Sequence, residues 1–256
     1  MGDVVRSEAI GGAWVLTVDR EETRNAIDPA VHDALSAAID RVEQDRHARA
    51  VILTGAGASF VSGGDLKLIR ERPFEETLAL SRRMNALLDR LEGLRVPVIA
   101  AINGWALGGG LEVALACDHR IADAGAKLAF RQAAMGVTTG WGAATRLARI
   151  VPRGAAVRLL ATAEVIDASR AEALGLVDEV APPGQSVARA LELARAIAEC
   201  SPRAVAAFKE VLRAAYGGDA ERSRAVEWDA FCGLWGGEDH REALDAFFAK
   251  RKPKWR

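Results

Sequence analysis

Two glycine-containing segments hold the residues best suited to chemistry in this chain. The first spans residues 60–67 and includes Gly63 and Gly64, and the second spans 103–112 and includes the glycine triplet 108–110. Because glycine has no side chain, a ligand can approach its backbone closely. Two such segments facing each other could hold a developing negative oxygen with backbone N–H groups, which is often the largest single contribution to catalysis. Neither segment matches a phosphate-binding P-loop or the G-x-G-x-x-G dinucleotide pattern.

Glu112 is the first candidate for proton transfer. It lies two positions after the glycine triplet, and its neighbours Leu111, Val113 and Ala114 are apolar. A carboxylate in the first turn of a helix is often a surface residue that compensates the helix dipole. The apolar neighbours instead favour burial beside the turn, and a buried carboxylate at such a place is a candidate general acid or base.

Alternating strands and helices must position these residues. The segments 13–19, 50–54, 97–102 and 117–122 are short and apolar, and they predict strands. Helices are predicted from Asp28-Pro29 onward, over 74–91, and from about Leu111. This alternation indicates an α/β fold. Both glycine segments follow a predicted strand, which is where ligands bind in open α/β sheets.

The second half of the chain is mainly helical in its residue pattern. The clearest break is Pro182-Pro183-Gly184. We therefore expect an α/β core over residues 1–183 and a helical C-terminal region over 184–256. No internal sequence repeat marks a further division.

The composition is that of an ordinary soluble globular protein, with 256 residues, 50% of them hydrophobic, and a formal net charge of −1. The near-zero charge argues against nucleic-acid binding, and no apolar run is long enough for a membrane helix. The four histidines lack metal-ligand spacing, so we predict no metal site. The three cysteines are expected to be small buried residues in a reducing compartment. The lack of a targeting signal predicts a cytoplasmic location.

Taken together, the ordered motifs resemble the crotonase superfamily, which includes the enoyl-CoA hydratases and isomerases. The resemblance covers nearly the whole chain and rests on residues 24–26, 60–67, 97–104, 108–112, 116–118, 166–168, 175–177 and 250–253. It implies a spiral of ββα units followed by a helical C-terminal region that forms trimers, which often pair into hexamers. It also implies an acyl-CoA substrate and no separate cofactor, since coenzyme A is part of the substrate.

The resemblance assigns roles to particular positions. The thioester carbonyl is expected between the backbone N–H groups of Ser62 and Gly109, with Glu112 as the catalytic carboxylate. The expected substrate-binding residues are Ala26, Gly63, Gly64, Asp65, Gly108, Gln132 and Trp141. Of these, Asp65 matches a family position that is largely structural and caps its loop.

One position departs from the family pattern. The hydratases use a second glutamate, and the matching residue here is Gln132, with no carboxylate between residues 127 and 142. Syn addition of water needs one group to activate the water and one to handle the proton at the α-carbon. The chain is predicted to be an enoyl-CoA hydratase-like lyase. One alternative is decarboxylation of a substituted malonyl-CoA, which needs no base to form the enolate. It is supported by similarity around Trp141-Gly142 to ethylmalonyl-CoA decarboxylases. The other alternative is a protein that binds an acyl-CoA without catalysis.

Overall fold

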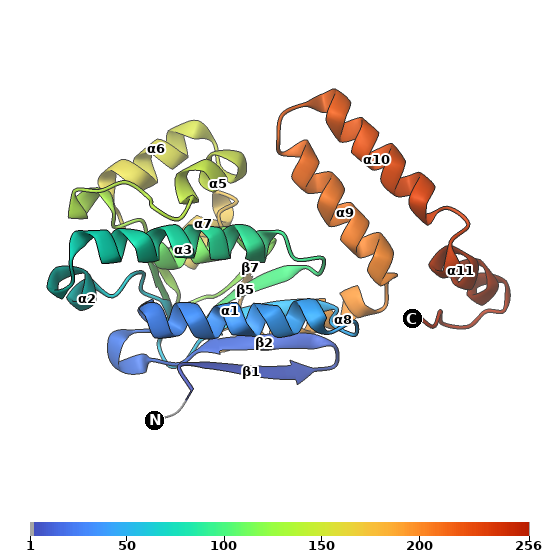
Figure 1. The fold of residues 1–256 in the computed structure, drawn as a ribbon, viewed down its shortest axis with the longest axis horizontal. Helices are drawn as coiled ribbons and strands as arrows, with labels where there is room; N and C mark the ends of the chain where they lie inside the picture. The colour runs from blue at the N-terminus through green and yellow to red at the C-terminus, as the bar shows by residue number, and fades with distance from the viewer. Residues whose placement is uncertain (1–2, 256) are drawn as a thin grey trace.

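The computed structural model describes residues 3–255. Its strands form two β-sheets, and helices pack against them (Figure 1). The larger sheet has the strand order β1-β2-β3-β5-β7-β10, and the smaller has the order β4-β6-β8-β9. In the larger sheet β1 pairs antiparallel with β2, and the other pairs are parallel. Its strands are β1 (Val5–Ile10), β2 (Ala13–Val18), β3 (Ala50–Gly55), β5 (Val98–Ile102), β7 (His119–Asp123) and β10 (Glu179–Ala181). The smaller sheet contains β4 (Ser59–Val61), β6 (Trp105–Leu107), β8 (Lys127–Ala129) and β9 (Ile166–Asp167).

The chain winds as a spiral in which each turn gives one strand to each sheet. The successive pairs are β3 with β4, β5 with β6, and β7 with β8, and like members of neighbouring turns pair in parallel. This confirms the predicted crotonase-like α/β fold. The strands predicted at 13–19, 50–54, 97–102 and 117–122 correspond to β2, β3, β5 and β7. In contrast, β4 was not predicted, because its three residues are too few to show a periodic pattern.

Helices cover both faces of the larger sheet, as expected for parallel strands that are buried on both sides. On one face, α1 (Pro29–Gln44) begins at Asp28, whose side chain accepts a hydrogen bond from the Val31 N–H at 2.9 Å. The long helix α3 (Phe74–Glu92) packs beside α1. On the other face lies α8 (Ser186–Ala198), whose Ala190 and Ala194 are buried against the sheet.

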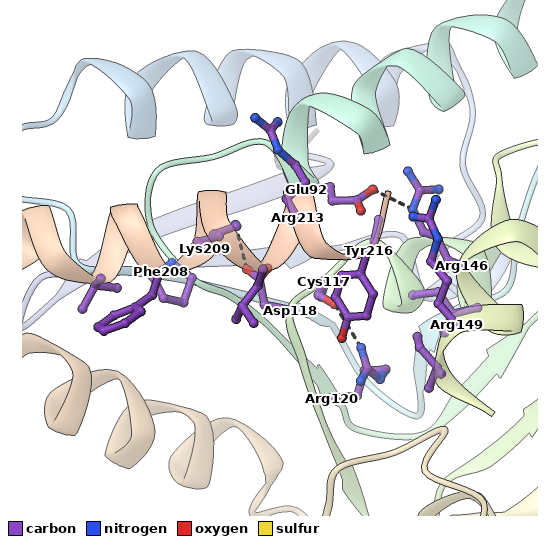
Figure 2. Close-up of a pocket in the computed structure, with 16 residues that line it drawn as sticks. Glu92, Cys117, Asp118, Arg120, Arg146, Arg149, Phe208, Lys209, Arg213 and Tyr216 are labelled. Carbon is purple, nitrogen blue, oxygen red and sulfur yellow. Dashed lines mark hydrogen bonds and ion pairs between the residues drawn. The ribbon is translucent and has the colours of Figure 1, made fainter. Parts of the chain in front are cut away.

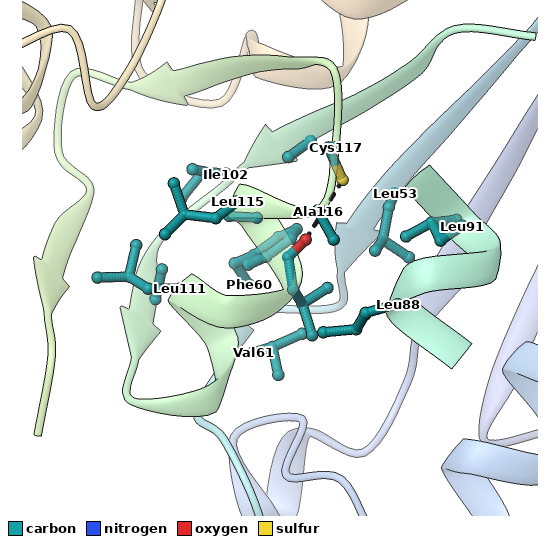
Figure 3. Packing of buried hydrophobic residues seen from close by; sticks show 14 of the residues in the cluster. Leu53, Phe60, Val61, Leu88, Leu91, Ile102, Leu111, Leu115, Ala116 and Cys117 are labelled. Atoms are coloured by element: carbon teal, nitrogen blue, oxygen red, sulfur yellow. Dashed lines mark hydrogen bonds between the residues drawn. The ribbon is translucent and has the colours of Figure 1, made fainter. Parts of the chain in front are cut away.

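The core between the two sheets is built from apolar side chains of the spiral and its first helices. Figure 3 shows side chains of α3, of β3, β4 and β5, and of α4 (Gly109–Leu115) meeting around Phe60, which is fully buried. The remaining helices of this part are α2 (Leu66–Glu71), α5 (Ala143–Ile150), α6 (Arg153–Thr162) and α7 (Ala168–Ala173), with short 3-10 turns at Glu21–Thr23 and Ala133–Met135. Because α4 begins within the glycine triplet and packs in this core, the core fixes the position of the second glycine segment.

The last three helices form an arm that leaves the α/β core (Figure 1). They are α9 (Pro202–Ala215), α10 (Ala220–Leu234) and α11 (Glu238–Phe248), and α9 packs alongside α10. Neither α9 nor α10 has a buried residue, and Phe208, Trp228, Trp235, Phe247 and Phe248 are exposed. The division into residues 1–183 and 184–256 stays a prediction.

The cysteine prediction was wrong for two of the three residues. Cys117 is buried at the end of α4, whereas Cys200 and Cys232 are exposed in this chain. Cys232 is on α10, and Cys200 lies between α8 and α9. Among the helices of residues 3–255, none combines the length and the apolar character needed to cross a bilayer.

Candidate active site

The two glycine segments meet where β4 and β6 end. Because these strands pair in parallel, residues 62–65 and 108–110 leave the same edge of the smaller sheet. Gly63 has a φ of +99°, and a Cβ there would lie 3.0 Å from the Gly109 nitrogen. The first segment is held by Ile27, whose N–H donates to the Gly63 carbonyl at 2.8 Å and whose carbonyl accepts from the Asp65 N–H at 3.0 Å. The predicted meeting of the two backbones is thus present.

A buried asparagine supports the first segment from below. The Asn25 side chain, fully buried with a φ of +59°, donates to the carbonyls of Ala56 at 2.9 Å and Ser59 at 2.7 Å and accepts from the Arg20 N–H at 2.9 Å. It thereby joins the stretch containing Ala26 to the turn that leads into β4. Asn25 was not among the predicted site residues, although it lies inside the first motif of the family resemblance.

The second segment turns sharply into α4. Gly108 has a φ of +53°, and its N–H donates to the Ala129 carbonyl at 2.8 Å. A Cβ on Gly110 would lie 1.8 Å from the Val61 carbonyl oxygen, so only glycine lets α4 pack directly on β4. Gly109 is the first residue of α4, and first-turn N–H groups have no partner within their helix.

Glu112 is buried, as predicted, with 3% of its surface exposed. Its carboxylate accepts hydrogen bonds from the Gln132 side-chain amide at 3.0 Å and from the backbone N–H groups of Trp141 at 2.7 Å, Ala143 at 3.1 Å and Gly140 at 3.4 Å. All four contacts are donated to the acid, which suits an ionised carboxylate because that form only accepts. We call the donors Gln132, Gly140, Trp141 and Ala143 the carboxylate clamp.

Gln132 and Trp141, which were predicted to bind substrate, both form hydrogen bonds to Glu112. The Oε1 atom of Gln132 is buried without a hydrogen-bond partner, which leaves one acceptor uncommitted beside the carboxylate. The Trp141 ring lies on Gly109, since a Cβ on that glycine would come within 2.4 Å of the ring. The predicted site residues between Ser62 and Trp141 thus form one continuous cluster.

Arg146 holds the clamp in place, a role that the sequence did not reveal. Its buried guanidinium donates to the Trp141 carbonyl at 2.7 Å, to Glu92 at 2.9 Å and to Asp89 at 2.7 Å. The last two residues belong to α3, so this helix is tied to the segment that holds Glu112.

Asp65 and Ser62 make structural contacts with their side chains. The Asp65 carboxylate caps α2 by accepting from the N–H groups of Lys67 at 3.1 Å and Leu68 at 3.2 Å. This agrees with the capping role expected for it. The Ser62 hydroxyl donates to the Thr23 carbonyl at 3.2 Å, which leaves backbone atoms to any substrate contact at that position.

A separate cavity of about 360 Å³ lies at the opposite end of α4, between the core and α9 (Figure 2). Lys209 of α9 reaches across it to Asp118 at 2.7 Å, and Arg146 lines its other side. Burial raises the pKa of the Cys117 thiol in this wall to about 12. The glycine triplet is at the other end of α4, so this cavity is not the site of the paired glycine segments. No group of three or more His, Cys, Asp or Glu side chains within residues 3–255 is arranged to bind a metal ion.

The spiral, the paired glycine segments and the buried glutamate define a protein of the crotonase type. The family model described as enoyl-CoA hydratase/isomerase matches residues 8–256. The chain belongs to this family.

Individual relatives cover almost the whole chain. A short-chain-enoyl-CoA hydratase of Clostridium acetobutylicum is 37% identical over 246 residues, which are 96% of this chain and 94% of the relative. A crotonyl-CoA hydratase of Syntrophomonas wolfei is 34% identical over 93% of this chain and 92% of its own. The crystal structure of an enoyl-CoA hydratase from Bacillus anthracis superposes with a TM-score of 0.95 at 33% identity, covering 98% of both chains.

Proposed function

We propose that this protein is an enoyl-CoA hydratase-like lyase that adds water across the double bond of a 2-enoyl-CoA. The observation that carries the proposal is the buried Glu112 carboxylate, held by four donors directly behind the meeting point of the two glycine segments. The similarity to proteins named as hydratases supports the same reaction. In this proposal the thioester carbonyl lies between the N–H groups of Ser62 and Gly109. Ala26, Gly63, Gly64 and Gly108 line the path of the substrate, and no separate cofactor takes part.

The chemistry balances with a single carboxylate. Glu112 accepts a proton from water while the water oxygen bonds to the β-carbon, and the electron pair of the double bond moves onto the thioester oxygen. The two N–H groups stabilise this enolate oxygen. When the enolate collapses, the α-carbon takes the proton from Glu112, and the carboxylate is restored. Gln132, which cannot exchange that proton, orients Glu112 through its amide N–H.

The decarboxylase alternative is not favoured, because the relatives described above carry hydratase names. The missing second glutamate nevertheless makes a paired assay the most informative experiment. Purified protein is given crotonyl-CoA and ethylmalonyl-CoA, with loss of enoyl absorbance and product mass as readouts, and the Glu112→Gln variant as control. Water addition that disappears in the variant supports the proposal. Loss of CO₂ with negligible hydration overturns it in favour of the decarboxylase, and turnover of neither substrate favours the binding protein.

We also propose that the arm assembles the protein into trimers or pairs of trimers. Support comes from the exposed aromatic residues of α9–α11, because large apolar side chains gathered on one part of a surface mark interaction sites. Sedimentation velocity over a range of concentrations tests this, and a species of one chain at micromolar concentration would contradict it. A cytoplasmic location stays a prediction.

A further inference from the structure

We propose that Trp141 sets the acyl-chain length of the substrate, by closing the site beyond the β-carbon so that only short 2-enoyl chains fit. The inference rests on the proposed function, because it takes the direction of the acyl chain from the proposed positions of the thioester carbonyl and the reacting carbons. It assigns to the Trp141 ring a selective role that is separate from the contact that its backbone makes with Glu112.

The Trp141 ring lies against both glycine segments. Three atoms of its six-membered ring, Cζ3, Cη2 and Cε3, lie 2.4, 2.8 and 2.9 Å from where a Cβ on Gly109 would be. A fourth, Cζ2, lies 3.9 Å from the corresponding position on Gly64. The indole therefore contacts the backbone of one segment and faces the other. With only 7% of Trp141 exposed, the ring is enclosed there.

Two hydrogen bonds fix the backbone that carries the ring. The Trp141 N–H donates to Glu112 at 2.7 Å, and the Trp141 carbonyl accepts from Arg146 at 2.7 Å. Arg146 is in turn bound to Asp89 and Glu92 of α3. Since both peptide groups of the residue are engaged, the backbone cannot shift the ring aside without breaking hydrogen bonds in a buried place.

The order of groups along a bound substrate brings its tail to this ring. With the carbonyl at Gly109 and the α- and β-carbons at Glu112, the next carbon enters the region bounded by the carboxylate and the residues whose backbone N–H groups contact it. Of these residues only Trp141 carries a large side chain. A crotonyl group places only one methyl beyond the β-carbon, whereas each further methylene must displace the ring or turn away from it. A tightly packed pocket discriminates roughly 10–200-fold per methylene.

The test is a chain-length series with the intact enzyme. The specificity constant kcat/KM is measured for 2-enoyl-CoA thioesters of four, six, eight and ten carbons, for the wild type and for Trp141→Ala and Trp141→Phe. Both variants keep the backbone N–H that contacts Glu112. The matched control is Trp105→Ala, because Trp105 is 41% exposed on β6. Binding of saturated acyl-CoAs of the same lengths is measured by calorimetry, and circular dichroism checks that each variant is folded.

We expect the wild-type kcat/KM to fall at least tenfold between four and eight carbons. In Trp141→Ala the ratio of eight-carbon to four-carbon activity should rise at least tenfold, with a smaller rise in Trp141→Phe and none in Trp105→Ala. Equal wild-type activity on all lengths, or an equal loss on all lengths in both Trp141 variants, overturns the role of the ring but leaves the hydratase proposal intact. If the wild type hydrates none of the thioesters, the proposed function fails, and the calorimetric series still decides whether Trp141 limits chain length.

Discussion

Replacing Glu112 by glutamine or by alanine should separate its chemical role from its structural one. Glutamine keeps the shape of the side chain and loses its ability to exchange a proton. One oxygen can still accept from the N–H groups of Trp141 and Ala143. The new amide nitrogen can donate to Gln132 once that side chain flips, because the Oε1 atom of Gln132 has no partner in the wild type. Only the long 3.4 Å contact from Gly140 is lost.

Alanine, in contrast, removes every acceptor. The N–H groups of Trp141 and Ala143, both in buried residues, and the amide of Gln132 would lose their partner. A buried donor without a partner costs about 1–3 kcal/mol. We therefore expect Glu112→Ala to lower the free energy of unfolding by roughly 2–5 kcal/mol, and Glu112→Gln by about 1 kcal/mol or less. Both should lower kcat for crotonyl-CoA hydration by at least about 10²-fold, the usual contribution of a general acid or base.

The assay combines initial rates with denaturant unfolding at one fixed protein concentration, because assembly would make stability depend on concentration. Two results would refute the reasoning. A Glu112→Gln enzyme with near wild-type kcat would remove Glu112 from proton transfer. Equal unfolding free energies for the two variants would mean that the four donors do not depend on the carboxylate for their hydrogen bonds.

Three further predictions concern neighbouring residues. Gln132→Glu should raise crotonyl-CoA hydration about tenfold by supplying a second acid, and an unchanged rate would mean that this position does not face the reacting carbons. Asn25→Ala removes three hydrogen bonds in a fully buried place, so urea unfolding should show a loss of about 2–4 kcal/mol; a loss below about 0.5 kcal/mol would contradict the supporting role of Asn25. The pKa of Cys117 is raised to about 12, so its thiol stays protonated at neutral pH and should react with a thiol reagent only after unfolding, later than the two exposed cysteines. Fast labelling of Cys117 in the native protein would contradict this.

The sequence was sufficient to predict the parts of the fold that have a long, regular pattern. The strand β5 is an unbroken apolar run, and β3 is apolar over its first four residues. The helix α1 carries both a helical apolar stripe and an Asp-Pro start. The smaller sheet could not be predicted in this way, because β4, β6 and β8 have three residues each and lie among glycines. Its existence depends on pairing between successive turns of the spiral, which is not a local property.

The site residues also divide into those with a local signal in the sequence and those without one. Glu112 could be predicted because a carboxylate among apolar residues is unusual wherever it occurs. The partners that hold it could not, since three of the four are backbone N–H groups, which every residue except proline possesses. The role of Arg146 could not be predicted either, because the sequence alone does not distinguish a buried arginine from a surface arginine.

The pairing of β4 with β6 also determines the width of the gap between the two glycine segments. Neighbouring strands of any sheet lie about 4.8 Å apart. If two N–H donors at that separation each form a hydrogen bond of about 2.9 Å to one oxygen, the angle at the oxygen is close to 110°. This is near the angle between the lone pairs of a negatively charged oxygen. The spacing between the two donors would then equal the distance between neighbouring strands, which the backbone hydrogen bonds of the sheet set. No side chain has to set this distance, and few substitutions can alter it.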